Sequence, residues 1–255
     1  MYDFVEGTIC LQLPETDEDF YQSAVGFGTF QQLLTDFPAA KLHETIPNFH
    51  NTPDRYRALL ETLERDPMHR AVQVQPEIEF ALARQAEMSA IQNALASGKL
   101  PLRVTHNDTK LNNVLLDAKT RKALCVIDLD TVMPGFVLSD IGDFIRTGAN
   151  TGAEDDANLD NVNVNIDIFK AYTRGYMEKA KSFLTPMEIK LLPYGGRLLT
   201  YMQTVRFLTD YINGDTYYKI HSPKHNLIRT KAQFKLLQSL EAHADEMDAF
   251  MSEWL

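Results

Sequence analysis

The sequence has few of the residues that mark secreted, membrane or fibrous proteins. Its 255 residues include two cysteines, Cys10 and Cys125, too few for the disulfide framework of a small secreted domain. The 11 prolines and 12 glycines are too few for an extended, linker-rich chain. The N-terminus lacks the basic segment and apolar run of a signal peptide, and no stretch approaches the 18 apolar residues of a membrane span. We therefore expect a cytoplasmic protein with no membrane partner.

Basic residues are also scarce. The chain has 25 lysines and arginines against 35 aspartates and glutamates, which gives a formal net charge of -10. Such a charge repels a phosphate backbone unless the basic residues gather in one patch, so we expect no nucleic-acid partner. The hydrophobic share of 44% is typical of soluble globular proteins and is enough to bury a core in one large domain or two small ones.

Apolar residues recur with helical spacing over most of the chain. Thr16-x-x-Asp19 predicts a cap ahead of a helix over residues 17–36, and Asn51-Thr52-Pro53 predicts the start of another that ends near residue 65. Further helices are predicted near residues 76–98, 139–148, 165–181, 187–213 and 226–252, and short β-type runs at 4–5, 8–11, 102–104, 114–116 and 124–127. The pattern predicts an α+β, mostly helical fold with a small β-hairpin insert.

Polar residues cluster around that hairpin. If its two strands fold back antiparallel, Leu115 faces Val126, and Asn113 faces Asp128 at the open end. Directly opposed residues have Cβ atoms about 5 Å apart, so a carboxylate and an amide oxygen converge there. Such hard oxygen ligands suit Mg²⁺, which also shares substrate phosphates. Asp108, on the loop that enters the first strand, is then placed to accept a proton from a hydroxyl nucleophile.

The same segment matches the phosphoryl-transfer template of protein kinases. The motif His-x-Asp-x-Lys-x-x-Asn at residues 106–113, followed by an apolar strand that ends at Asp128, matches the catalytic loop and the metal-binding aspartate. The spacing favours a role for Lys110 on the transferring phosphate. Asn107 stands where protein kinases have arginine, and Asp-Leu-Asp replaces Asp-Phe-Gly. Both departures point toward kinases of small molecules.

Two motifs carry a resemblance to a known family. Residues 105–113 (Thr-His-Asn-Asp-Thr-Lys-Leu-Asn-Asn) and 126–135 (Val-Ile-Asp-Leu-Asp-Thr-Val-Met-Pro-Gly) resemble the aminoglycoside phosphotransferase and choline kinase superfamily, and within it the N-acetylhexosamine 1-kinases. The resemblance continues through residues 42–53 and 206–211 and covers essentially the whole chain. It implies a protein-kinase-like C-terminal lobe, ATP and Mg²⁺ as cofactors, and the anomeric hydroxyl of N-acetylglucosamine or N-acetylgalactosamine as acceptor.

The resemblance also implies roles for individual residues. Asp108 would be the base, and Asn113 and Asp128 would be Mg²⁺ ligands. Three further residues would lie near the sugar: Asp130, Thr131 and Arg206.

By the same comparison, residues 1–12 are the hinge and the start of the C-lobe, and residues 13–255 are the C-lobe itself. The C-lobe would hold the catalytic loop (104–113), a metal-binding segment (124–131) and a helical substrate subdomain (138–255). Backbone groups at Phe4 and Val5 would contact adenine.

Complete kinases cover the phosphates with a glycine-rich loop and an N-lobe lysine. Here the first lysine is Lys41 and no GxGxxG motif occurs. We therefore expect that the N-lobe is missing, that the chain is inactive alone, and that it self-associates through the face that the N-lobe would cover.

Several alternatives remain open. Aspartates and asparagines such as Asp108 also favour turns, and His106 has only a supporting role. Asp140 and Asp143 favour capping and charging the N-terminus of a helix over catalysis, although Asp140 is also placed to tether the catalytic loop. His221 and His225 have a metal-ligand spacing, but Pro223 argues against a helix there. The acceptor could instead be choline, homoserine or an aminoglycoside, or the chain could be a non-catalytic lobe that binds a sugar or a protein.

Overall fold

The computed structural model describes residues 3–255, with only the backbone described for residues 89–96. The fold is mixed α+β and mostly helical, as the sequence predicts. The helices are α1 (Asp17–Leu33), α2 (Thr52–Arg65), α3 (Gln75–Ala96), α4 (Val137–Thr147), α5 (Ile166–Ala180), α6 (Pro186–Ile212), α7 (His225–Ala242) and α8 (Ala244–Met251). The strands are β1 (Thr8–Cys10), β2 (Arg103–Thr105), β3 (Val114–Asp117), β4 (Ala123–Val126) and β5 (Met133–Gly135).

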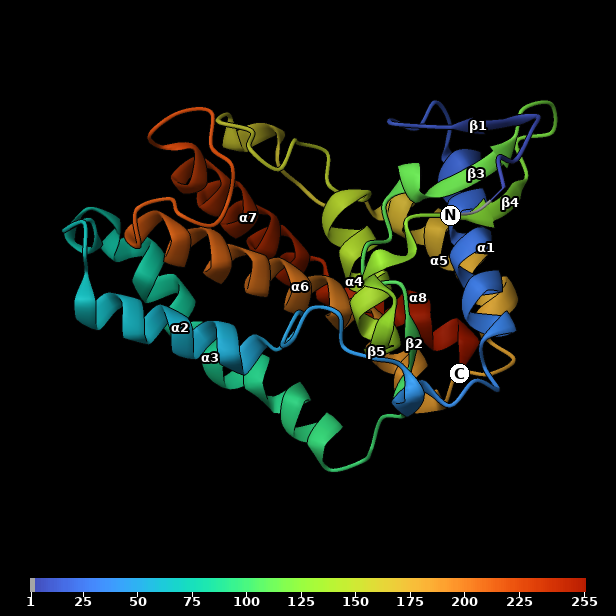
Figure 1. Cartoon of the computed structure of the whole chain (residues 1–255), viewed down its shortest axis with the longest axis horizontal. Helices are drawn as coiled ribbons and strands as arrows, with labels where there is room; N and C mark the ends of the chain where they lie inside the picture. The colour runs from blue at the N-terminus through green and yellow to red at the C-terminus, as the bar shows by residue number, and fades with distance from the viewer. Residues whose placement is uncertain (1–2) are drawn as a thin grey trace.

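The helices form two groups with α4 between them (Figure 1). Helices α1 and α5 pack against each other under an antiparallel sheet of order β1-β3-β4. Helix α6 packs on α4, α7 and α2, and a two-stranded sheet of β2 and β5 lies beside α4. The buried apolar side chains of both groups form one continuous core. None of the described helices is long and apolar enough to span a bilayer.

The predicted cap at Thr16 is confirmed, and it does more than start a helix. The Asp19 carboxylate accepts hydrogen bonds from the backbone N–H groups of Glu15 and Thr16, both at 2.9 Å. Arg121, in the turn between β3 and β4, donates to the same carboxylate at 2.8 and 2.9 Å. Burial alone would raise the pKa of Asp19, but these donors hold it below its ordinary value. The cap therefore fastens the hairpin to α1.

The predicted hairpin forms, but its register differs from the prediction. Leu115 pairs with Cys125 rather than Val126, and a bulge follows in which Leu116 pairs with Ala123. The bulge takes up Leu124, whose side chain is exposed. The pairing therefore differs from the prediction by two residues beside the turn and by one residue at the open end.

The open end of the hairpin shifts in the same way. Asn113 lies opposite Ile127, whose N–H donates to the Asn113 carbonyl at 2.9 Å, so the prediction that Asn113 faces Asp128 is wrong. Asp128 is the next residue, and with φ of 62° it turns the chain out of the strand.

Other boundaries also differ from the predictions. The helix predicted over residues 226–252 is two helices, which meet at His243. His221 lies in the turn before α7, as Pro223 indicated. The run at residues 4–5 is not a strand, and β5 was not predicted.

Helix α4 reaches its position because two glycines let it approach α6 closely. A Cβ atom on Gly142 would lie 2.3 Å from the carbonyl oxygen of Gly195, and one on Gly195 would lie 2.5 Å from the carbonyl oxygen of Leu138. Any larger residue would force the helices apart. This contact fixes the helix that anchors the site described below.

We expect Asp19→Ala to lower the free energy of unfolding by about 2 kcal/mol, because it removes a helix cap and an ion pair together. Chemical denaturation would measure the loss. Since folding lowers the Asp19 pKa, its contribution is present above the unfolded value and is lost as the pH falls through the folded one.

Glu15→Ala is the matched control. Glu15 contacts the same arginine at 3.1 Å, but its side chain is 66% exposed, so its loss should cost less than about 0.5 kcal/mol. Equal losses for the two variants would contradict the role assigned to Asp19.

Candidate active site

The loop of residues 104–113, called the catalytic loop below, is held by a buried carboxylate on α4. Asp140 accepts hydrogen bonds from the backbone N–H of His106 at 3.0 Å and of Asn107 at 2.7 Å. The side-chain amide of Gln31, on α1, donates to it at 2.6 Å. Burial raises the pKa of the Asp140 carboxyl, and these donors offset part of that rise.

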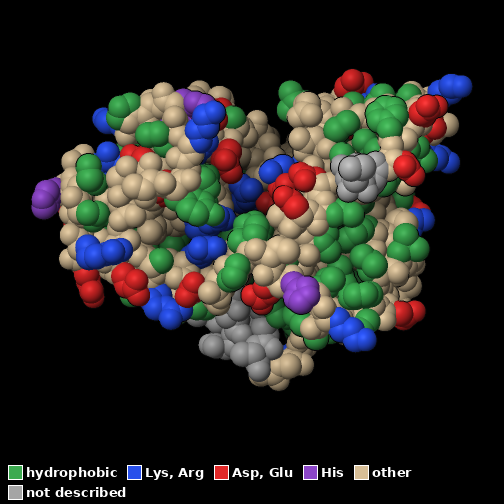
Figure 2. All heavy atoms as spheres, in the orientation of Figure 1, with side chains coloured by type: hydrophobic (Ala, Val, Ile, Leu, Met, Phe, Trp, Pro, Cys, Tyr) green, Lys and Arg blue, Asp and Glu red, His purple; other side chains and the backbone are tan. Residues whose placement is uncertain are grey.

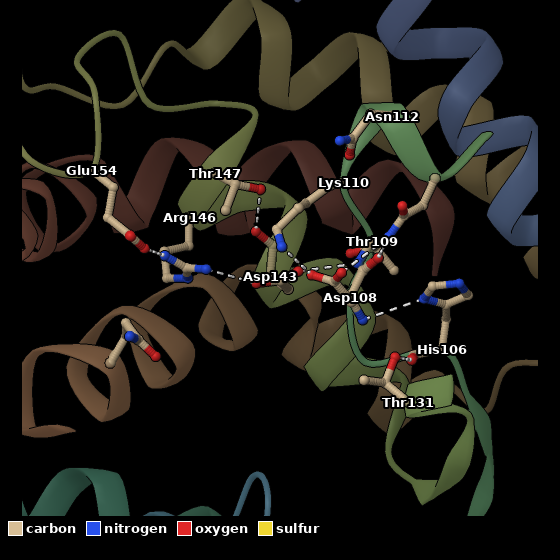
Figure 3. A network of polar contacts seen from close by, with 12 residues as sticks. His106, Asp108, Thr109, Lys110, Asn112, Thr131, Asp143, Arg146, Thr147 and Glu154 are labelled. Atoms are coloured by element: carbon tan, nitrogen blue, oxygen red, sulfur yellow. Dashed lines mark hydrogen bonds and ion pairs between the residues drawn. The ribbon is translucent and has the colours of Figure 1, made fainter. Parts of the chain in front are cut away.

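A second carboxylate, one turn further along α4, holds the next part of the loop (Figure 3). Asp143 accepts a hydrogen bond from the backbone N–H of Thr109 at 3.0 Å and pairs with Arg146 at 3.0 Å. The sequence favoured helix capping for both aspartates. The capping part is wrong, because α4 begins at Val137 with no side-chain cap. Asp140 lies in the first turn of α4 and tethers the loop, as the sequence left open, and Asp143 tethers it as well.

His106 supports the loop from inside the core. Its ring is fully buried and lies edge-on to Phe27 and Phe30, with centroid distances of 5.2 and 5.8 Å. Nδ1 accepts from the backbone N–H of Asp108 at 3.3 Å, so Nε2 carries the hydrogen that it donates to the Ile127 carbonyl at 2.9 Å. A neutral ring therefore joins the catalytic loop to the end of β4, in the supporting role that the sequence predicts.

Asn107 joins the catalytic loop to the turn after β4. Its φ of 67° is left-handed, a conformation that asparagine tolerates better than most residues. Its side-chain amide donates to the carbonyl of Thr131 at 3.0 Å, and the Thr131 hydroxyl donates to the carbonyl of His106 at 2.7 Å. Thr131 thus braces the loop, while the side chain of Asp130 is exposed beside it.

Asp108 lies where the tethered loop meets a large cavity. Its Oδ1 is 2.7 Å from Lys110 Nζ, and its Oδ2 accepts from Asn113 Nδ2 at 3.0 Å. Burial works against the charge of Lys110, but the Asp108 carboxylate raises the pKa of the lysine above its ordinary value. The carboxylate, the lysine and the amide therefore form one cluster, with Asp108 a quarter exposed.

Asn113 and Asp128 have the chemistry that a magnesium ion requires. Asn113 Nδ2 donates to both the carbonyl and the carboxylate of Asp108, which leaves its Oδ1 as a free acceptor. Asp128 is exposed and follows directly after the residue that pairs with Asn113. One carboxylate and one amide oxygen, with water and phosphate completing the shell, fit Mg²⁺. Within the described residues, no group of three or more His, Cys, Asp or Glu side chains is arranged to hold a metal.

The cavity beside Asp108 has a volume of about 940 Å³. Figure 2 shows a hollow between the two halves of the molecule, with charged side chains along it. Asp108, Lys110 and Arg206 line the cavity, whereas Asn113, Asp128, Asp130 and Thr131 are not among its lining residues. Lining residues that the sequence did not single out include Phe49, His50, Glu154, Met202 and Gln203.

Arg206 lies in an aromatic and polar corner of this cavity. It donates to Gln203 at 3.0 Å, and its guanidinium lies 5.4 Å from the ring centroid of Tyr218 and 5.7 Å from that of Phe49. Burial, with Arg206 nearby, lowers the pKa of His50 to about 3, so that ring is neutral.

The predicted hinge residues lie at the start of the described chain. Phe4 is 87% exposed, and the Val5 carbonyl accepts a hydrogen bond from the Thr8 hydroxyl at 2.8 Å. Met1 and Tyr2, which belong to the same prediction, lie outside the described residues. The contact of this segment with adenine stays a prediction.

The model of the family described as "Phosphotransferase enzyme family" (APH) matches residues 1–175, more than half of the chain. The matched segment contains the whole catalytic loop, the hairpin and helix α4.

We expect Asp140→Ala to lower the free energy of unfolding by at least about 3 kcal/mol. It leaves two buried backbone N–H groups without an acceptor, and each costs about 1–3 kcal/mol. Chemical denaturation and amide hydrogen exchange at residues 106 and 107 would measure the effect.

Ser139→Ala, which removes a neighbouring buried hydroxyl from α4, serves as the control and should cost under about 1 kcal/mol. If the amides of residues 106 and 107 exchange as slowly in Asp140→Ala as in the unmodified chain, Asp140 does not hold the loop.

Proposed function

The chain belongs to the phosphotransferase enzyme family, and from that premise we propose that it transfers the γ-phosphoryl group of ATP to the anomeric hydroxyl of an N-acetylhexosamine. One observation carries the proposal. The Asp108 carboxylate, held by Asn113 and Lys110, lines a cavity of about 940 Å³ that also contains Arg206. A base, a cation and a hydrogen-bonding pocket are the parts that transfer to a small hydroxyl compound requires.

Asp108 acts as the base in this proposal. The acceptor hydroxyl gives its proton to the carboxylate while its oxygen bonds to the γ-phosphorus and the bond to ADP breaks. Lys110 Nζ lies 2.7 Å from Asp108 Oδ1. As the carboxylate takes up the proton, the lysine ammonium group pairs with the transferred phosphoryl group instead. His106 keeps the base in place through the N–H of Asp108.

Asn113 and Asp128 would hold Mg²⁺, which when bound neutralises charge on the phosphates of ATP. The amide of Asn113 is oriented for this task because both of its hydrogens are donated to Asp108. A change of either residue should therefore weaken nucleotide binding more than acceptor binding.

A sugar fits the other end of the cavity better than choline does. Arg206, Gln203 and Tyr218 offer hydrogen bonds beside aromatic faces, a combination suited to hydroxyl groups. A quaternary ammonium would meet the positive charge of the arginine. Contacts of Asp130 and Thr131 with the sugar rest on the family resemblance alone.

The phosphates of ATP also need a cover. The sequence has no glycine-rich loop and no lysine before Lys41. We therefore expect slow turnover unless residues outside this sequence supply the cover, with the backbone at Phe4 and Val5 contacting adenine.

The test is ³¹P NMR of the chain with Mg-ATP and N-acetylglucosamine or N-acetylgalactosamine, beside a form that includes any residues encoded upstream. We expect a sugar 1-phosphate signal that grows slowly with the chain alone and faster with a form that supplies the phosphate cover. In that faster form, Asp108→Asn should lower the rate by about 10²–10⁴-fold. Asp117→Asn is the matched control, because Asp117 only closes the turn between β3 and β4 and should leave the rate unchanged.

Phosphate on another hydroxyl of the sugar, or transfer to a different acceptor in a parallel screen, would replace the anomeric assignment. Full activity in Asp108→Asn would show that Asp108 is not the base.

A further inference from the structure

We propose that Glu154 recognises a hydroxyl group of the acceptor in the cavity and, through Arg146 and Asp143, acts on the position of the catalytic loop. This inference rests on the proposed function for its acceptor half. Its other half, the connection to the loop, stands on the free protein alone.

Glu154 presents a carboxylate to the cavity. It lies in the loop of residues 148–158, which forms one wall of the cavity and which we call the wall loop. Its side chain is 41% exposed, and its Oε1 is 2.6 Å from Arg146 Nη1. The contacts of this carboxylate all use Oε1, so Oε2 is left to accept a hydrogen bond from a hydroxyl group.

The wall loop holds Glu154 in a fixed place. The next residue, Asp155, accepts from His225 Nε2 at 2.9 Å at the start of α7. On the other side, the N–H of Thr151 donates to the Asn163 carbonyl at 2.9 Å, and Asn150 bridges to Val164. A side chain fixed from both sides loses little freedom when a ligand binds, which is the condition for selective recognition.

A continuous chain of charged contacts leads from Glu154 to the catalytic loop (Figure 3). Arg146, whose side chain is only 10% exposed, joins Glu154 to Asp143, and Asp143 accepts the backbone N–H of Thr109 at 3.0 Å. Thr109 lies between Asp108 and Lys110. Burial raises the pKa of Asp143 and works against its charge, so the charge of Asp143 depends on that of Arg146.

The balance of charge explains how Glu154 would act. Arg146 is shared between two carboxylates, Asp143 and Glu154. A hydroxyl that donates to Glu154 reduces the pull of Glu154 on the guanidinium and strengthens the pair with Asp143. An acceptor in the cavity therefore tightens the tether at Thr109, beside the base.

The first arm of the test measures hydrogen exchange in the free chain. In Glu154→Gln, which keeps the shape but removes the charge, the pull on Arg146 is reduced and the Thr109 amide should exchange at least about 3-fold more slowly than in the unmodified chain. Faster exchange would contradict the direction of this effect. Glu241→Gln is the matched control, because it removes the charge from another arginine–glutamate pair, with Arg84, away from the cavity. An unchanged Thr109 amide in Glu154→Gln would overturn the connection to the loop.

The second arm measures acceptor binding by calorimetry with N-acetylglucosamine and its 3-, 4- and 6-deoxy analogues. One analogue should bind the unmodified chain about 10-fold more weakly than the parent sugar, and this difference should shrink to about 2-fold in Glu154→Ala. Glu241→Gln should keep the full difference. Equal discrimination among the sugars in all three proteins would overturn the recognition half.

The two arms separate this inference from the proposed function. If the unmodified chain binds none of the sugars, the proposed acceptor is wrong and the recognition half fails with it. The exchange of the Thr109 amide still decides the connection to the loop in that case. Circular dichroism melting of each variant shows whether a loss of binding reflects unfolding instead.

Discussion

The hydrogen bonds from the backbone N–H groups of His106 and Asn107 to the buried Asp140 carboxylate hold the rest of the site in place. Burying a charged carboxylate costs free energy unless hydrogen-bond donors surround it. Here two of the donors are backbone N–H groups of the catalytic loop itself. The energetic requirement of Asp140 and the geometric requirement of the loop are therefore met by the same bonds. Because the backbone of His106 and Asn107 is fixed by these bonds, the backbone of the next residue, Asp108, is oriented as well.

Helix α4 connects this restraint to the rest of the fold. Its close contact with α6 at Gly142 fixes the helix, and its two carboxylates, Asp140 and Asp143, hold the loop at successive points. From Asp143 the contacts continue through Arg146 to the wall of the cavity. Asp108, the cavity wall and the core are thus joined by one series of contacts, and preorganisation of this kind favours reactions that depend on positioning.

Much of this could be predicted from the sequence because the signals were local. Helical periodicity and caps gave the ends of α1 and α2 to within a few residues, and the motif at residues 106–113 gave the catalytic loop. The register of the hairpin was off by one at its open end because it depends on how the turn after Asp117 closes and on the bulge at Leu124, and no local pattern in the sequence fixes either. The spacing of Asp140 and Asp143 favoured helix capping because capping is a local pattern, and only the resemblance to kinases suggested a tether at Asp140. The backbone N–H groups that the two carboxylates bind lie 33 or 34 residues away in the chain, too far for a local pattern to reveal them.

The proposed function requires that Asp108, Asn113 and Asp128 belong to one site at the open end of the hairpin. The most direct measurement is paramagnetic broadening of the amide NMR signals by Mn²⁺ in place of Mg²⁺, with a non-hydrolysable ATP analogue present. The account predicts that the signals of residues 108, 113 and 128 broaden at the lowest Mn²⁺ concentrations, before those of exposed acidic residues such as Glu178 and Glu253. Broadening that begins at those exposed residues and leaves the three site residues sharp would contradict it.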